Sequence, residues 1–170
     1  MILTTTRDDH LIAWLTALAI TIHIAESALP SPLPGIKPGL ANVITIAVLL
    51  RYGWRMAAWV GLLRVLVGSL LLGTLFSPTF WLSLSGALCT ITILGASYGL
   101  MKFLPGRGLS ALGYSVLAAM AHMAGQFYVA YLLFIPHPAL FHLLPVLMTA
   151  AVIFGVVSGM ITNAMLQRLP

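Results

Sequence analysis

Charged residues are scarce in this chain. Its 170 residues include three acidic and eight basic side chains, so only 6% of the sequence is charged. Soluble domains carry about 25%. Hydrophobic residues make up 61%, and the mean hydropathy is +1.07. This composition excludes a soluble globular domain and predicts an integral membrane protein.

Cysteine and clusters of basic residues are also lacking. Cys89 is the single cysteine and lies in an apolar stretch, which excludes a disulfide framework and a metal site built from several cysteines. The formal net charge of +5 is spread along the sequence. A nucleic-acid surface needs basic residues clustered on one polar face, so no nucleic-acid partner is predicted. We also predict no metal and no cofactor.

Long hydrophobic runs dominate the sequence, and a helix needs about 20 apolar residues to cross a bilayer. Five runs meet this requirement, and Leu40 to Leu50 is shorter and predicts a short or broken helix. We predict one all-α transmembrane domain over residues 1–170, a bundle of six helices in the lipid bilayer. The predicted spans are Leu11–Leu29, Leu40–Leu50, Met56–Leu75, Thr79–Met101, Leu109–Ile135 and Leu143–Leu166.

The basic residues between these spans predict the orientation, because cytoplasmic loops gather Lys and Arg. With the amino terminus inside, the outer segments contain Lys37 as their one Lys or Arg. Both termini are then cytoplasmic in a multi-pass protein of the cell (cytoplasmic) membrane. The basic residues of the inner segments are Arg7, Arg51, Arg55, Lys102, Arg107 and Arg168.

Residues 23–42 depart most from the rest of the composition, with four prolines and two glycines between Pro30 and Gly39. Prolines remove backbone donors and stiffen the chain, so this segment is interpreted as a shaped loop over a site. Glu26 lies just before it, at the end of a predicted span. A carboxylate there is costly without a partner, and its default interpretation is functional. Lys37 is one candidate partner.

Arg64 lies inside the third predicted span, nine residues from Arg55 and thus about 13 Å along the helix. Snorkelling to the headgroups is one interpretation. Its helical face continues through Ala57, Gly61 and Gly68, and small residues favour a packed or cavity-lining face over a lipid-facing one. We expect Arg64 to point into the bundle as a ligand-binding or counter-charge residue, with Glu26 as its nearest candidate partner.

The fifth span places His122 and Gln126 one turn apart on one helical face, which Ser115 continues. Bridging between helices and ligand binding explain this pair equally well. His23 and Asn42 extend the polar set. Haem ligation by His23 and His122 is a weaker alternative, because lone histidines within membranes more often form hydrogen bonds.

Small residues spaced by four allow helices to approach closely, and each such pair can pack internally or dock a membrane partner. The pairs are Ala13 and Ala17, Gly95 and Gly99, and Gly155 and Gly159.

Several strings resemble one family over nearly the whole chain. They are H-x-x-E-S-x-L-P from His23, P-G-x-K-x-G-L-A-N from Pro34, L-R-x-x-x-G-S-L-L-x-G-T from Leu63, S-P-x-F-x-L-S-x-S-G from Ser77, G-L-S-x-L-G from Gly108 and H-x-x-G-Q from His122. The sequence thereby resembles the Gx transporter family, also described as heptaprenyl diphosphate synthase component I. That family is similar in architecture to the six-helix S components of energy-coupling factor vitamin transporters.

The resemblance implies uptake of a vitamin, a cofactor precursor or a similar small ligand. Such a subunit depends on a transmembrane coupling subunit and its ATPases, and this sequence has no phosphate-binding Gly-Lys-Ser/Thr loop of its own. The Ala13 and Ala17 pair resembles the alanines with which S components dock their partner. Arg64 and Lys37 suit an anionic ligand group. The predicted ligand site, near the outer half, consists of Glu26, Lys37, Asn42, Arg64, His122 and Gln126.

Other functions remain open from the sequence. Prenyl diphosphate synthases need clustered aspartates to hold Mg²⁺, whereas this chain has only Asp8 and Asp9. We therefore predict no catalytic residues and no enzyme activity by this chain alone. An accessory membrane subunit of polyprenyl diphosphate or quinone metabolism is one alternative. A membrane component of flavin- or quinone-linked electron transfer is another.

Overall fold

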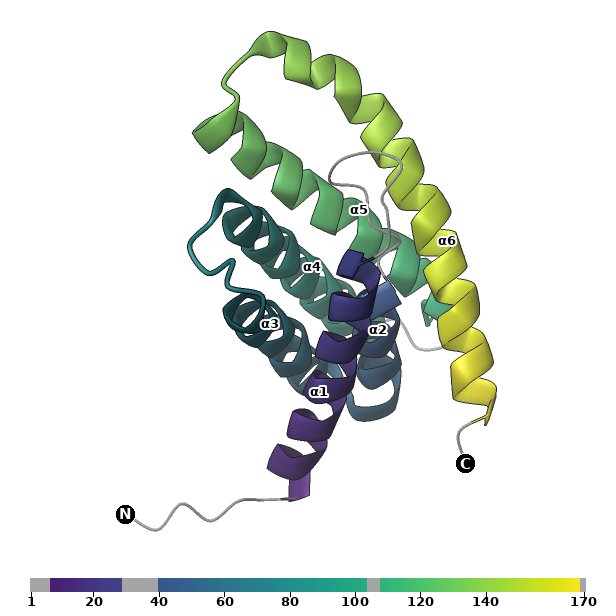
Figure 1. Cartoon of the computed structure of the whole chain (residues 1–170). Helices are drawn as coiled ribbons and strands as arrows, with labels where there is room; N and C mark the ends of the chain where they lie inside the picture. Colours follow the sequence, from purple (N-terminus) through teal and green to yellow (C-terminus); the bar gives the residue numbers. More distant parts are fainter. Residues whose placement is uncertain (1–6, 29–39, 104–107, 169–170) are drawn as a thin grey trace.

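The structure is a computed structural model that describes residues 7–28, 40–103 and 108–168 (Figure 1). Within these residues the chain is all-α and contains no strand. The sequence predicted this class correctly, including the short second helix. The helices are α1 (Arg7–Ala28), α2 (Leu40–Tyr52), α3 (Trp54–Leu71), α4 (Pro78–Lys102), α5 (Ala111–Val129) and α6 (Leu144–Arg168), with a π-helical turn η1 (Ala130–Phe134) and a 3₁₀ helix η2 (Pro138–Leu143) between the last two.

Four helical stretches in the described residues are long and apolar enough to cross a membrane: Trp54–Leu71, Pro78–Met101, Ala111–Phe134 and Pro138–Arg168. The described parts of α1 and α2 add two shorter apolar stretches, Asp9–Ala25 and Asn42–Tyr52. The first residue of α1 and the last residue of α6 lie at the same end of the bundle (Figure 1). The fold is therefore that of a multi-pass membrane protein.

Local sequence sets several helix boundaries. Ser77 caps α4 by accepting a hydrogen bond from the Phe80 amide at 3.3 Å, and Pro78 follows as the first helical residue. Ser110 caps α5 in the same way through the Gly113 amide at 3.2 Å. Gly53 separates α2 from α3 with φ of 91°, a conformation that glycine adopts without strain. These signals fix the turns, so the helices are held in register.

The short helix α2 occupies the centre of the bundle. Every residue from Val43 to Leu49 is buried, and α2 contacts α1, α3, α5 and α6. A helix that is apolar on all sides needs neighbours on all sides. The functional groups on α1, α3 and α5 are therefore arranged around α2.

Glycines bring the later helices close together. A Cβ on Gly125 would lie 2.7 Å from Cys89 Sγ of α4, and one on Gly159 would lie 2.6 Å from the Leu112 Cα of α5. Gly155 packs on Val116 of α5 in the same way, with a built Cβ 2.8 Å from its Cα. For Gly155 and Gly159, the internal-packing alternative is thus confirmed.

The two small residues predicted on α4, Gly95 and Gly99, have different environments. Gly95 receives the Trp54 indole, whose Nε1 donates a hydrogen bond to the Ile91 carbonyl at 3.0 Å. Gly99 has open space beside it, with nothing within 4 Å of a built Cβ. Only Gly95 therefore supports close helix packing.

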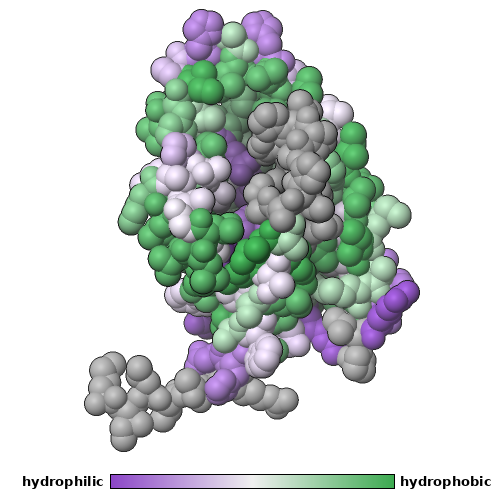
Figure 2. All heavy atoms as spheres, in the orientation of Figure 1, coloured by the Kyte–Doolittle hydropathy of each residue, from purple (hydrophilic) through white to green (hydrophobic). Residues whose placement is uncertain are grey.

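The visible surface is hydrophobic between two more hydrophilic ends (Figure 2). Large apolar side chains are exposed on the molecule, among them Trp14 at 77% and Met160 at 62%. Such a surface is costly in water and is stable in contact with lipid. Arg51 and Arg55 are exposed on either side of the turn between α2 and α3, and Arg168 is exposed at the end of α6. The orientation of these ends relative to the two sides of the membrane stays a prediction.

Candidate functional site

Arg64 of α3 points into the bundle. Only 7% of it is exposed, and the small residues of its helical face, Ala57, Gly61 and Gly68, are all buried. A snorkelling arginine would keep its guanidinium at the membrane surface. The structure therefore rules out snorkelling and confirms that Arg64 belongs to the interior.

His122 of α5 lies directly against α4 at Gly86. A Cβ built on Gly86 would lie 2.7 Å from His122 Cε1 and 2.7 Å from Nδ1, so the ring occupies the space that glycine leaves. His122 Nε2 is 2.9 Å from the same Cβ position and lies 3.2 Å from the Gln126 side-chain nitrogen. The amide of Gln126 can only donate through that nitrogen, so with this assigned orientation Nε2 accepts. The ring proton of neutral His122 is then on Nδ1.

This Nδ1 atom lacks a well-formed hydrogen bond in the structure. It is buried and has no hydrogen-bond partner of ordinary geometry within the described part of the chain, although the Gly86 backbone lies beside it. Buried polar atoms are paired in the large majority of cases, and each exception calls for an explanation. A donor left open inside the protein suits a ligand atom that accepts a hydrogen bond.

His23 of α1 joins the same region. Its Cδ2 lies 3.6 Å from the position of a Cβ on Gly68, one turn beyond Arg64 on α3. Arg64 and His23 are both near enough to His122 to act on it electrostatically. Basic and polar side chains from α1, α3 and α5 therefore converge on one region, with Gly86 of α4 as its wall.

Asn42 of α2 lies at the same depth as Arg64. Thr45 Cγ2 is 3.6 Å from the Cβ position of Gly61, which fixes the register of the antiparallel helices α2 and α3. Asn42 is three residues from Thr45, and Arg64 is three residues from Gly61, both in the same direction along the bundle. Asn42 is half-buried. It remains a candidate for the site.

Of the six predicted site residues, the structure brings His122 and Gln126 into contact, and it places Arg64 within electrostatic range of His122 and Asn42 at the depth of Arg64. The Glu26 side chain and Lys37 lie outside the described residues, so their roles and the Glu26 to Arg64 pairing stay predictions. His23, which the sequence placed in the polar set but not in the site, belongs with them. Gly68 and Gly86 were missed as site residues.

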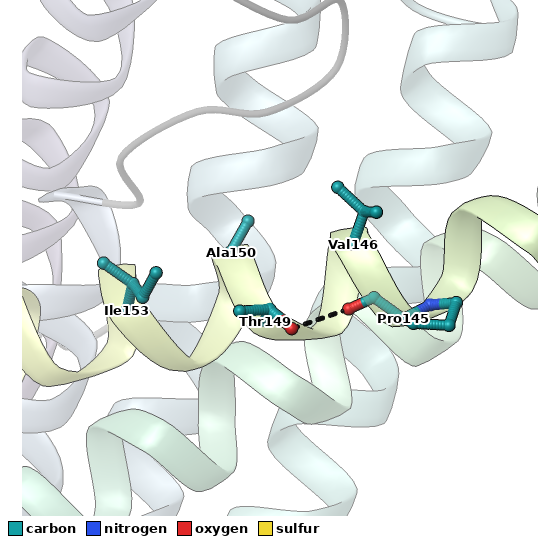
Figure 3. Close-up of a pocket in the computed structure, with 5 residues that line it drawn as sticks. All are labelled: Pro145, Val146, Thr149, Ala150 and Ile153. Atoms are coloured by element: carbon teal, nitrogen blue, oxygen red, sulfur yellow. Dashed lines mark hydrogen bonds between the residues drawn. The ribbon is translucent and has the colours of Figure 1, made fainter.

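A separate depression of about 400 Å³ lies on α6, lined by Pro145, Val146, Thr149, Ala150 and Ile153 (Figure 3). The Thr149 hydroxyl donates to the Pro145 carbonyl at 2.8 Å, so its lining offers a ligand mainly apolar contacts. None of the predicted site residues lines it. Its chemistry fits an apolar chain and contrasts with the polar cluster.

Ala13 and Ala17, the predicted docking pair, are both exposed on α1. Trp14 and Leu18 flank them and are 77% and 47% exposed. This face is therefore not used for packing within the described chain. No three His, Cys, Asp or Glu side chains gather to hold a metal ion in the part of the chain that the structure describes.

The fold and the buried residues define a multi-pass α-helical membrane protein with a polar cluster inside its helix bundle. The chain belongs to the family described as heptaprenyl diphosphate synthase component I, whose family model matches residues 15–165. No curated protein and no solved structure matches the chain. The family description and the membrane fold indicate a membrane accessory subunit.

Proposed function

We propose that this protein is a small-molecule-binding subunit for uptake across the membrane, and that its ligand carries an anionic group held by Arg64, His122 and His23. The observation that carries the proposal is the Nδ1 donor of His122, which is buried without a hydrogen bond of ordinary geometry and lies within electrostatic range of the Arg64 guanidinium. Both groups favour a ligand that accepts hydrogen bonds and carries negative charge. Gln126 holds the His122 ring in the orientation that presents Nδ1.

Arginine suits this role better than lysine would. Its guanidinium stays charged at every physiological pH and offers donors in a planar fork that matches carboxylate and phosphate. An ionisable side chain at membrane depth is costly to maintain and usually marks a functional site. Lys37 and Asn42 are proposed to contact the same ligand, with Glu26 binding a cationic or donating group on it.

We propose uptake because the chain resembles S components. These subunits bind the ligand, and a coupling subunit with ATPases supplies the energy for transport. The exposed Ala13 and Ala17 pair on α1 supports this proposal, because it is free to accept a partner helix at close range.

Native mass spectrometry of the protein isolated in lipid nanodiscs tests the binding site. We expect the parent protein to carry a bound small molecule, and Arg64→Ala and His122→Ala to lose it. Arg64→Lys should also lose most of the bound molecule, because lysine keeps the positive charge and lacks the planar guanidinium with its paired donors. Arg55→Ala is the matched control, since Arg55 is on the same helix and exposed. Equal occupancy in Arg64→Ala and Arg55→Ala would refute the site.

A second function is supported by the family description, which names a component of a synthase. In this alternative the protein retains a prenyl diphosphate for a catalytic partner, with the diphosphate at Arg64 and the chain along apolar surface. Heptaprenyl diphosphate added to nanodiscs would then bind tightly and stay with the protein, and no uptake into vesicles would follow. Bound molecules with a flavin or haem absorbance band would instead point to electron transfer.

A further inference from the structure

The polar cluster ends at an apolar floor on the side where α1 begins and α6 ends, the inner end of the bundle. One helical turn inward of each polar residue lies a residue that is 0% exposed and belongs to the hydrophobic core. These residues are Ala19 inward of His23, Ile46 inward of Asn42, Val60 inward of Arg64 and Ala118 inward of His122. Burying a charge in apolar surroundings is costly. A charged ligand group therefore ends at the cluster, and the rest of the ligand lies outward of it.

Helix α2 begins at the depth of this cluster. Its first residue, Leu40, precedes Asn42 by two residues, which corresponds to about 3 Å along the helix. Asn42 lies at the depth of Arg64, so in the same register Leu40 lies about 8 Å inward of Leu71, the last residue of α3. The amino end of α2 is therefore within the bundle and not at its outer surface.

Backbone amides in the first turn of a helix have no partner within that helix. In α2 they include the amides of Leu40, Ala41 and Asn42, because the carbonyls four residues earlier precede the helix. Partial positive charge gathers at the amino end of a helix, which favours anions there. Transporters with interrupted helices direct such ends at anionic groups inside the membrane.

Side chains near the amino end of α2 indicate an anion independently of the helix end. Arg64 is only 7% exposed and brings a positive charge to this depth. His122 Nδ1 is buried without a hydrogen bond of ordinary geometry, and His122 lies within electrostatic range of Arg64. Asn42 shares a helical face with Thr45, which contacts α3, so Asn42 lies on the side of α2 that faces the helix of Arg64. Helix α2 also contacts α5, the helix of His122.

Donors from three helices approach an anion from different directions. A phosphate group accepts hydrogen bonds through three strong acceptor oxygens, which are arranged around a tetrahedral centre. A carboxylate has two oxygens, and both lie in one plane. Donors on α2, α3 and α5 therefore match a phosphate better than a carboxylate.

We propose that the backbone amides in the first turn of α2 bind the anionic group of the ligand together with Arg64 and His122, and that this group is a phosphate. The inference rests on the proposed function, because Arg64 and His122 hold the same group there. The phosphate is the innermost part of the ligand, and the remainder extends outward past His23. A soluble phosphorylated molecule and the headgroup of a phospholipid share this chemistry.

Isothermal titration of the protein in phosphatidylcholine nanodiscs tests the phosphate class. Phenylphosphonate and benzoate carry the same ring and differ in the anion. We expect phenylphosphonate to bind the parent about 10-fold more tightly, the effect of one further charge-assisted hydrogen bond, and to lose this affinity in Arg64→Ala. Phosphatidic acid added to the nanodiscs distinguishes the two sources of phosphate. It should compete with phenylphosphonate if the natural ligand is a lipid headgroup, and fail to compete if the ligand is soluble; the amide site stands in both cases.

Two substitutions of one residue isolate a backbone amide. Leu40→Pro removes the amide hydrogen of Leu40, and proline fits the first position of a helix. Leu40→Ala is the matched control, because it shortens the side chain and keeps the amide. We expect Leu40→Pro to bind phenylphosphonate about 10-fold more weakly than Leu40→Ala, with benzoate much less affected. Melting temperatures establish that both variants fold.

A carboxylate placed in the first turn of α2 provides a second test that does not depend on proline. Asn42→Asp should bind phenylphosphonate at least 10-fold more weakly, because its negative charge takes the place of the anion beside Arg64. Its ligand-free form should melt at or above the parent temperature, since a carboxylate is stabilising at the amino end of a helix. The control Asn163→Asp, at an exposed position of α6, should bind phenylphosphonate like the parent.

Equal binding of phenylphosphonate by folded Leu40→Pro and Leu40→Ala would overturn the role of the amides and leave the anionic site standing. Asn42→Asp that binds phenylphosphonate like Asn163→Asp, or that melts well below the parent, would do the same. Benzoate binding as tight as that of phenylphosphonate would overturn the phosphate class. If neither probe binds the parent, or if both bind Arg64→Ala as they bind the parent, the proposed function and this inference fail together.

Discussion

At the scale of single residues, Gly86 determines how His122 is presented. The His122 ring fills the position that a Cβ would take, 2.7 Å from Cε1 and Nδ1. Gly86→Ala should therefore displace the ring, weaken its bond to Gln126 and reduce ligand occupancy. Overpacking of this kind costs about 1 to 3 kcal/mol. Occupancy by native mass spectrometry and the melting temperature measure both effects.

Gly99→Ala on the same helix is the control for this change. Nothing lies within 4 Å of a Cβ there, so alanine should stabilise the helix by roughly 0.5 to 1 kcal/mol and leave occupancy unchanged. Gly86→Ala with the occupancy of the parent would show that the ring position does not govern binding.

The sequence predicted Arg64, His122 and Gln126 as inward-facing because helical spacing fixes which residues share a face. It could not place Gly86 against His122, since that contact joins α4 to α5 and depends on how the helices cross.

The same holds for buried hydroxyls: Thr162 donates to the Ser158 carbonyl of its own helix at 2.8 Å, whereas the Thr16 and Ser115 hydroxyls have no hydrogen-bond partner among the described residues. Whether a threonine bonds its own helix or stays unbonded depends on side-chain rotamer and on neighbouring helices, which spacing along one helix does not show.

At the scale of helices, two pairs of small residues with the same spacing have opposite environments. Ala13 and Ala17 are exposed on α1, whereas Gly155 and Gly159 pack against backbone atoms of α5. Spacing alone could not distinguish the two pairs, because a spacing of four favours close approach to any helix. The resemblance to S components singled out Ala13 and Ala17 for docking. The structure assigns the pair on α6 to internal packing.

This difference predicts different consequences of substitution. Ala17→Leu should leave the melting temperature and ligand occupancy unchanged and reduce recovery of a membrane partner, as well as uptake. Gly159→Leu should destabilise the protein by several kcal/mol, because a Cβ there already lies 2.6 Å from the Leu112 Cα. Pull-down yield measures the loss of partner binding, and thermal melting measures the loss of stability. A drop in melting temperature for Ala17→Leu would make the α1 pair an internal contact.

At the scale of the whole molecule, composition alone predicted the class, because a bilayer requires long apolar helices. The predicted run Leu40–Leu50 became α2 (Leu40–Tyr52), and the central position of this helix explains why apolar residues occur all around it. In the sequence, its shortness indicated a short or broken helix. Its contacts with four other helices could be seen only in the folded bundle.

The distribution of basic residues predicts the orientation of the bundle. In a variant with Cys89 replaced by alanine, a cysteine at His137 should react with an impermeant maleimide added to intact cells. A cysteine at Arg55 should react only after permeabilisation, because Arg51 and Arg55 hold that turn in the cytoplasm. Both positions are exposed. Labelling of the two from the same side would contradict the six-span topology.

The central claim is that the cluster of His23, Arg64, His122 and Gln126 binds the ligand, and a crystal structure of the protein with its co-purified molecule tests it most directly. We predict ligand density in contact with the Arg64 guanidinium and an acceptor atom within about 3.2 Å of His122 Nδ1. Density confined to the apolar depression at Pro145, Thr149 and Ile153, with His122 Nδ1 still unbonded, would contradict it.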